Sequence, residues 1–181
     1  MSGHSKWSKV KHQKATTDAV KSSAFTRASR AITIAVKDGG GIADPDGNFK
    51  LRLAIEKAHA VNMPKDNITR AIARGKGGDS QSMFSETYEG YGPHGVAFYI
   101  ETVTDNKQRT VASIKQILSH AGGSMASPGA VSFLFSRRGV VMKPNSTIPL
   151  EEKEFGDVTA CTDRLEELDD VQQVFTNAEE I

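Results

Sequence analysis

Apolar residues recur at helical spacing in three stretches of the first half of the chain. The first stretch follows Thr17 and Asp18, either of which favours the start of a helix, and it ends at Gly39–Gly41. Asn48 is placed to cap a second helix, which Met63-Pro64 ends because proline disfavours helical geometry in the residue before it. Pro64 also suits the first position of a third helix. The predicted inner faces of the three helices are Ala24, Phe25, Ala28, Ala31, Ile32, Ala35 and Val36; Leu51, Ala54, Ile55, Ala58 and Val61; and Ile68, Ala71 and Ile72.

The second half of the chain predicts strands interrupted by helices. Phe84–Glu89 and Val96–Val103 have strand patterns and flank the glycine-rich loop Gly90–Gly95. Asn106 is expected to cap a helix that ends at Gly122 and Gly123. The remaining predicted elements are strands at Val131–Phe135 and Val140–Met142 around a turn at Arg137–Gly139, a helix at Glu151–Leu168, and a last strand at Val171–Phe175.

These elements predict an α+β protein in which an N-terminal three-helix domain precedes a ferredoxin-like α/β domain. From Val96 onward the predicted order is βαββαβ, the split-βαβ arrangement, with one extra strand in front. We expect a basic flexible tail at 1–16, a helical domain at 17–78 that ends in the glycine-rich linker 75–78, and a ferredoxin-like α+β domain at 79–181.

Charge divides unevenly between the two halves. Residues 1–78 carry 15 Lys and Arg against 6 Asp and Glu, whereas residues 79–181 carry 8 against 16. A half this basic attracts phosphates and repels acidic protein surfaces. The alternative is a solubilising face that the acidic half compensates.

The composition also bears on where the protein works. No apolar run is long enough for a membrane-spanning helix, and the first residues do not form a secretory signal. Cys161 is the one cysteine, so an intramolecular disulfide is excluded, which fits a reducing compartment. We therefore expect a cytoplasmic protein with no membrane partner.

No motif predicts catalysis. Gly90-x-Gly92-x-x-Gly95 matches the dinucleotide fingerprint in form, but it joins two predicted strands where the chemistry needs a helix start. The five histidines form no i,i+4 pair, so a metal site is not expected. Acidic residues surround Cys161 in the sequence and should raise the pKa of its thiol, which makes it a poor nucleophile. We predict a protein that is not an enzyme and has no cofactor and no small-molecule substrate.

The basic half has the pattern of a nucleic-acid-binding surface. Trp7 lies among lysines, where its ring can stack on an unpaired base. The predicted site comprises Lys6, Trp7, Lys9, Lys11, His12 and Lys14 in the tail and Arg27, Arg30, Lys37, Arg70 and Arg74 on the helices. The alternatives are that Trp7 folds the tail onto the helical domain and that the helix cations form a solvated face. No predicted helix offers the Arg/Asn/Gln cluster of a major-groove reader, so the predicted site favours unpaired RNA slightly over duplex DNA as its ligand.

The start of the helix after Asn106 is a second candidate anion site. The free backbone amides there, together with Asn106, Lys107 and Arg109, could hold an anion. Ordinary helix capping is the preferred explanation of the same residues.

Five motifs occur in fixed order along the chain: Gly3-His-Ser-Lys-Trp7, Lys11-His12-x-Lys14, Asn62-Met-Pro-Lys-Asp-Asn-Ile68, Thr87-Tyr-Glu-Gly-Tyr-Gly-Pro93 and Thr104-Asp-Asn-Lys-x-Arg-Thr110. Together they resemble the YebC/PmpR family, whose relatives include the mitochondrial translational activator of cytochrome c oxidase. The resemblance implies a non-enzymatic regulator that binds nucleic acid. Bacterial members are usually described as DNA-binding transcriptional regulators, while other work on the family points to ribosomes and relief of stalling at proline-rich stretches.

One departure from the family changes what the resemblance implies. Members usually carry a third, acidic α/β domain after the strand corresponding to Gly139–Met142, whereas this chain passes almost directly to Pro144–Leu150.

The partners that the family resemblance implies are DNA, ribosomal RNA and the ribosome. A protein-interaction adaptor, whose acidic half binds a partner, is the alternative from another class.

Overall fold

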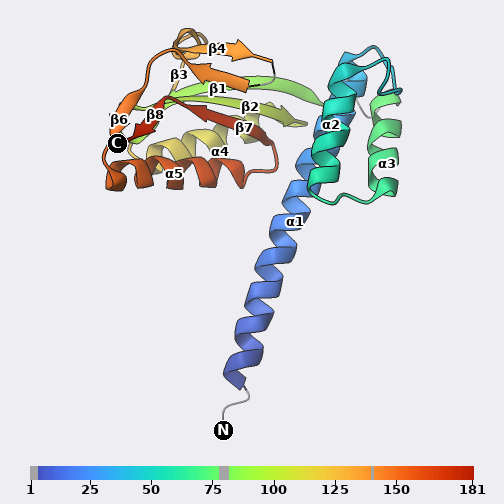
Figure 1. The fold of residues 1–181 in the computed structure, drawn as a ribbon, viewed down its shortest axis with the longest axis horizontal. Coiled ribbons are helices and arrows are strands. Elements are labelled where there is room, and N and C mark those ends of the chain that lie inside the picture. The colour runs from blue at the N-terminus through green and yellow to red at the C-terminus, as the bar shows by residue number, and fades with distance from the viewer. Residues whose placement is uncertain (1–3, 78–81, 140) are drawn as a thin grey trace. The chain divides into compact units, whose positions relative to one another are not determined.

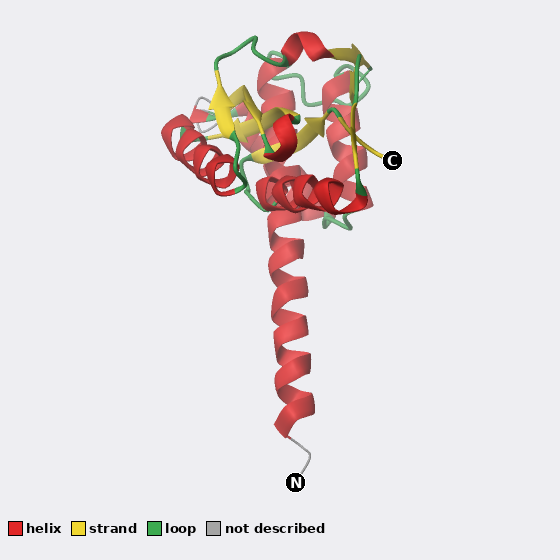
Figure 2. Cartoon of the chain, turned by 90° about the vertical axis from the view of Figure 1, so that its left-hand side faces the viewer, coloured by secondary structure: helices red, strands yellow, loops and turns green. Residues whose placement is uncertain are grey.

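The computed structural model describes the backbone of residues 4–77, 82–139 and 141–181, and side chains from residue 20 onward in those ranges. The chain divides into two compact units, Met1–Ser80 and Gln81–Ile181 (Figure 1). The first unit is helical, and every strand that the structure describes lies in the second, yellow in Figure 2. The predicted α+β class, with a three-helix domain before an α/β domain, is confirmed.

The helical unit consists of α1 (His4–Asp38), α2 (Phe49–Ala60) and α3 (Lys65–Lys76). The predicted start of the first helix near Thr17 or Asp18 is wrong, because α1 begins at His4. Among the described side chains of α1, the buried apolar ones lie between Ala28 and Val36. Apolar periodicity indicates only the part of a helix that packs on a core, so it could not predict that this helix begins many residues before its packed part. The flexibility of the segment 1–16 stays a prediction.

Asn48 fixes the turn between α1 and α2, as its predicted capping role requires. Its side-chain oxygen accepts a hydrogen bond from the Leu51 backbone N–H at 3.1 Å. Its amide nitrogen donates to the carbonyl oxygens of Ala35 at 2.9 Å and Ile42 at 3.0 Å. Asn48 is buried, so these bonds satisfy a side chain that water does not reach.

Two details at the ends of α2 and α3 differ from the sequence prediction. Val61 follows the last residue of α2 and is exposed, so it does not belong to the inner face. Gly75 belongs to α3 rather than to a linker. A Cβ atom on Gly75 would lie 2.5 Å from Cβ of Val36 and 2.9 Å from the carbonyl oxygen of Thr33, so this glycine permits the close approach of α3 to α1.

The second unit is built on a four-stranded antiparallel sheet. Its strands are β1 (Phe84–Tyr91), β2 (Ala97–Thr104), β3 (Ser124–Ala126) and β7 (Val171–Thr176), in the order β3-β1-β2-β7. The helices α4 (Lys107–His120) and α5 (Glu152–Glu166) cover one face, below the sheet in Figure 1. Phe98 and Ile100 of β2 meet Leu118 and Leu165 in the core between them.

A hairpin covers the opposite face of the sheet. It consists of β4 (Phe135–Arg138) and β5 (Val141–Pro144), which pair antiparallel with each other. Ala97 of β2 packs with Val131, Phe135 and Met142 in a second core. The short strands β6 (Ile148–Leu150) and β8 (Ala178–Glu180) pair in parallel, and the 3-10 turn η2 (Pro93–Gly95) links β1 to β2.

The predicted strand at Val131–Phe135 is wrong. Ser132–Leu134 form the 3-10 turn η3, and the strand begins only at Phe135. The carboxylate of Glu89 accepts hydrogen bonds from the backbone N–H groups of Gly129, Val131 and Ser132 at 2.8, 2.7 and 2.9 Å. Those amides are therefore not available to a strand ladder. Arg137 and Arg138 consequently belong to β4, and the turn follows at Gly139, whose φ is +64°.

None of the helices in the described ranges is both long and apolar enough to cross a membrane.

Candidate nucleic-acid interface

The helical unit brings α1 and α3 into close contact along one seam. The Thr33 hydroxyl donates to the Ala71 carbonyl oxygen at 3.1 Å, and Gly75 lies against Val36. Residue numbers rise together along both helices at these contacts, so α1 and α3 run in the same direction.

The cations predicted on these two helices border this seam on the same side. At about 100° per residue, Lys37, Arg30 and Arg27 lie about 40°, 60° and 120° beyond Thr33, on the side away from Val36. On α3, Arg74 lies about 60° beyond Ala71, on the side away from Gly75, and Arg70 lies further round in the same sense. Because the two helices are parallel and these rotations have opposite sense, the side chains project from one flank. We call this set the α1–α3 cationic ridge: Arg27, Arg30, Lys37, Arg70 and Arg74.

The members of the ridge differ in their exposure. Arg70 and Arg74 of α3 are exposed, whereas Arg27, Arg30 and Lys37 of α1 are half-buried. The three α1 residues each make a polar or electrostatic interaction within the protein. The long side chains on α1 therefore pack their stems against the unit, and α3 presents the most accessible charges.

Asn67 is a residue of this surface that the sequence analysis missed. It lies one turn before Arg70, whose guanidinium donates a hydrogen bond to the Asn67 side-chain oxygen. Asn67, Arg70 and Arg74 therefore share one side of α3, at i, i+3 and i+7 spacing. The sequence analysis did not include Asn67 in the predicted site, although its spacing from Arg70 and Arg74 was a signal that could have revealed it.

The tail residues of the predicted site lie outside the described side chains. These are Lys6, Trp7, Lys9, Lys11, His12 and Lys14, whose backbone from residue 4 onward belongs to α1. Stacking of Trp7 on a base, and its alternative as a contact that folds the tail back, both stay predictions.

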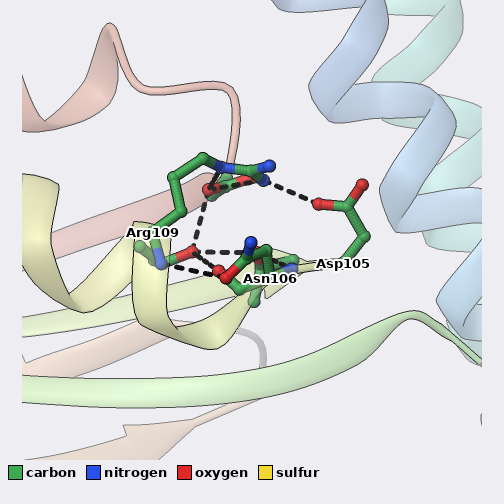
Figure 3. A network of polar contacts seen from close by, with 6 residues as sticks. Asp105, Asn106 and Arg109 are labelled. Carbon is green, nitrogen blue, oxygen red and sulfur yellow. Dashed lines mark hydrogen bonds and ion pairs between the residues drawn. The ribbon is translucent and has the colours of Figure 1, made fainter.

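The predicted second anion site has the geometry of a helix cap (Figure 3). The side-chain oxygen of Asn106 accepts from the backbone N–H of Arg109 at 3.0 Å. The guanidinium of Arg109 pairs with Asp105 at 2.6 Å and with Asp170 at 2.9 Å, and these hydrogen bonds, that to Asp170 first, raise the pKa of Arg109. Lys107 pairs with Glu86. Carboxylates of the protein therefore take the places that an external anion would need, which favours the capping explanation.

Asp170 completes this cap from the start of β7. It is buried, and besides the bonds from Arg109 it accepts a hydrogen bond from the Thr110 hydroxyl at 2.8 Å. The Thr110 hydroxyl also lies 2.8 Å from the Thr104 hydroxyl. The network thus joins the end of β2, the first turn of α4 and the approach to β7, which is a structural role.

In the described part of the chain, no group of three or more His, Cys, Asp or Glu side chains is arranged to hold a metal ion. Cys161 is buried in the core, and burial raises the pKa of its thiol while Arg164 lowers it. The direction agrees with the sequence analysis, but the cause is burial rather than the acidic neighbours.

Comparisons with known proteins match most of the chain. A family model described as "TACO1/YebC protein N-terminal domain" matches residues 5–78, and one described as "TACO1/YebC second and third domain" matches residues 83–143. A "Probable transcriptional regulatory protein" of Chlorobaculum tepidum is 52% identical over 149 residues, 82% of this chain and 59% of that protein. One from Citrifermentans bemidjiense is 44% identical over 178 residues, 98% of this chain and 71% of that protein.

A solved structure shares the fold. The crystal structure of a conserved hypothetical protein from Aquifex aeolicus matches with a TM-score of 0.81 at 28% identity, covering 91% of this chain and 92% of that one. This chain spans 59% of the length of the Chlorobaculum relative.

Proposed function

Because the chain belongs to the TACO1/YebC family, we propose that it is a non-enzymatic regulator of gene expression that binds nucleic acid through the α1–α3 cationic ridge. The curated relatives bear the name probable transcriptional regulatory protein, which supports a role in transcription. The observation that carries the proposal is the position of five cations on one flank of two packed helices. A polyanion on that flank meets the exposed Arg70 and Arg74 and lies beside the half-buried Arg27, Arg30 and Lys37, and each neutralised phosphate releases counterions.

The exposed face of α3 favours duplex DNA as the ligand. Asparagine reads adenine and arginine reads guanine in the major groove, and one side of α3 carries the exposed Arg70 and Arg74 beside the half-buried Asn67. The second candidate is ribosomal RNA and a role on the ribosome, which the lysine-rich tail with Trp7 favours because an aromatic ring stacks on unpaired bases. A protein-interaction adaptor, with the acidic half as its binding surface, is a third reading from another class.

Salt dependence of binding tests the proposal. If about six phosphates are neutralised, the slope of log K against log salt for duplex DNA is about −5, and for single-stranded RNA about −4. The double variant Arg70→Gln/Arg74→Gln should make the duplex slope shallower by about 2. A slope near zero for the unmodified protein on both ligands refutes nucleic-acid binding.

A matched control removes the same charge elsewhere in the unit. Lys50 and Lys57 lie on α2, which contacts α1 on the Ala35 side through Asn48 rather than along the seam with α3. Lys50→Gln/Lys57→Gln should leave the slope nearly unchanged. If both double variants change the slope equally, binding follows net charge alone and the ridge has no special part in it. Duplex DNA bound no better than single-stranded RNA of equal length would favour the ribosomal alternative.

A further inference from the structure

The hairpin β4–β5 presents a defined outward face. In its register Ser136 pairs with Lys143, and Arg138 pairs with Val141. Directly opposed residues of an antiparallel pair project to the same side, and Phe135 and Met142 project to the other, where they are buried against the sheet. The outward side chains are Ser136, Arg138, Val141 and Lys143, all exposed.

An exposed aromatic residue lies next to this hairpin in the chain. Phe133 is 69% exposed, although it is a large apolar residue. The Asn145 amide donates to the Phe133 carbonyl oxygen at 3.2 Å, and the Ser136 hydroxyl hydrogen-bonds the same Asn145 side chain. The backbone of Phe133 therefore adjoins the outward residues, and its side chain is exposed. We call Phe133, Ser136, Arg138, Val141 and Lys143 together the hairpin face.

The backbone that carries Phe133 is held by a buried carboxylate. Glu89 is 7% exposed and binds three backbone N–H groups, the last of which belongs to Ser132, the residue before Phe133. Hydrogen bonds donated to a charged acceptor are among the stronger hydrogen bonds in proteins. Binding of a ligand to Phe133 therefore loses little conformational entropy in this loop.

The charge of this part of the chain is opposite to that of the unit as a whole. Residues 106–150 contain six Lys and Arg and no Asp or Glu, whereas residues 151–181 contain eleven Asp and Glu and two Lys and Arg. Arg137, on the inward side of β4, pairs with Glu101, while Arg138 and Lys143 project outward. The hairpin face is thus a cationic surface with an aromatic ring on an otherwise acidic unit.

We propose that the hairpin face binds single-stranded nucleic acid, with Phe133 stacked on a base and Arg138 and Lys143 against phosphates. Sheet surfaces with exposed aromatics and flanking cations bind unpaired nucleotides in this manner, and a duplex does not offer its base faces to such a ring. The hairpin face lies in the second unit. It therefore adds a binding site for single strands to the function proposed for the ridge of the helical unit.

The test uses the full chain with the ridge disabled. In the Arg70→Gln/Arg74→Gln background, binding of a fluorescent oligouridylate of about 12 nucleotides, within the range of site sizes of single-strand-binding folds, is followed by anisotropy. Phe133→Ala should weaken binding about 5- to 100-fold, Phe133→Leu nearly as much, and Phe133→Trp should preserve it. Arg138→Gln/Lys143→Gln should make the salt slope shallower by about 1.4, and Lys115→Gln/Lys153→Gln, the matched control on α4 and α5, should not.

The outcomes separate this inference from the proposed function. If Phe133→Ala or Phe133→Leu binds as tightly as the parent, stacking is refuted, even when the ridge variants weaken duplex binding as expected. If the unmodified protein binds neither duplex nor single strand, the proposed function fails as well. A dimer in light scattering that Phe133→Ala dissociates, with RNA binding unchanged, would assign the face to a second copy of the chain and overturn the inference.

Discussion

Replacement of Glu89 by glutamine tests how strongly one buried carboxylate holds the loop before the hairpin. In the protein, one carboxylate oxygen accepts from Gly129 and the other from both Val131 and Ser132. Glutamine keeps one acceptor oxygen, so its NH2 group must face one of the N–H donors. Hydrogen bonds to charged groups contribute about 1.5–3 kcal/mol each, so losing one and weakening the others should lower the free energy of unfolding by about 2–4 kcal/mol.

The pH dependence distinguishes the charge from the shape of the side chain. Burial by itself raises the pKa of Glu89, but the backbone N–H bonds from Gly129, Val131 and Ser132 outweigh it and hold the pKa below the ordinary value of 4.5. The folded chain therefore binds this proton more weakly than the unfolded chain. The carboxylate stabilises the fold fully above about pH 5 and loses its contribution as the pH falls through the folded value. The difference between the parent and Glu89→Gln should shrink accordingly.

Urea unfolding followed by circular dichroism, repeated between about pH 7 and pH 3, measures both effects. Glu86→Gln is the control, because Glu86 lies on the same strand and pairs with Lys107 at the surface. That variant should cost less than about 1 kcal/mol. A loss for Glu89→Gln no larger than the control, or one that persists undiminished at about pH 3, would refute the account of Glu89 as a charged anchor.

Two further changes test the packing and the tail. Gly75→Ala should lower the free energy of unfolding of the helical unit by about 1–3 kcal/mol, because the added Cβ would overlap Val36 and the Thr33 carbonyl. Gly156→Ala in α5 is the control: its Cβ meets nothing within 4 Å, so it should stabilise the protein by about 1 kcal/mol. Equal effects of the two variants in urea unfolding would contradict the close approach of α3 to α1. Trp7→Ala should weaken binding to single-stranded RNA more than to duplex DNA in anisotropy titrations, and equal losses would count against stacking.

Local signals predicted the elements whose boundaries depend on local chemistry. Asn48 and Asn106 cap α2 and α4 as predicted, since a side chain that bonds an amide three residues ahead acts within one turn. The start of α1 at His4 was missed because the sequence marked only the packed part of that helix. β6 and β8 were missed because each is short and pairs with a partner far along the chain. The segment 131–134 was mistaken for part of a strand because Glu89, whose carboxylate binds the N–H groups of Val131 and Ser132, is also remote in sequence.

The candidate site likewise combines features that local sequence predicted with features that depend on residues far apart in the chain. Helical angles placed Arg27, Arg30 and Lys37 opposite the core of α1 and put Arg70 and Arg74 on one side of α3. Their shared flank required the Thr33–Ala71 contact, which fixes how the two helices are rotated against each other. Conversely, Asp105 and Asp170 neutralise Arg109, and Asp170 lies too far along the chain for a sequence motif to include it.

Net charge per domain was the least informative of the sequence measures, and the layering of the second unit explains why. The sheet separates α5, with five acidic and two basic residues, from the β4–β5 hairpin, with three basic residues and no acidic one. Packed layers stand about 10 Å apart, so the solvent sides of these two layers are separated by about 20 Å or more. The Debye length at physiological ionic strength is about 8 Å, so the acidic helix is largely screened from an anion on the hairpin. A polyanion therefore encounters a local cationic surface on a unit whose summed charge would repel it, and position on the fold decides the interaction.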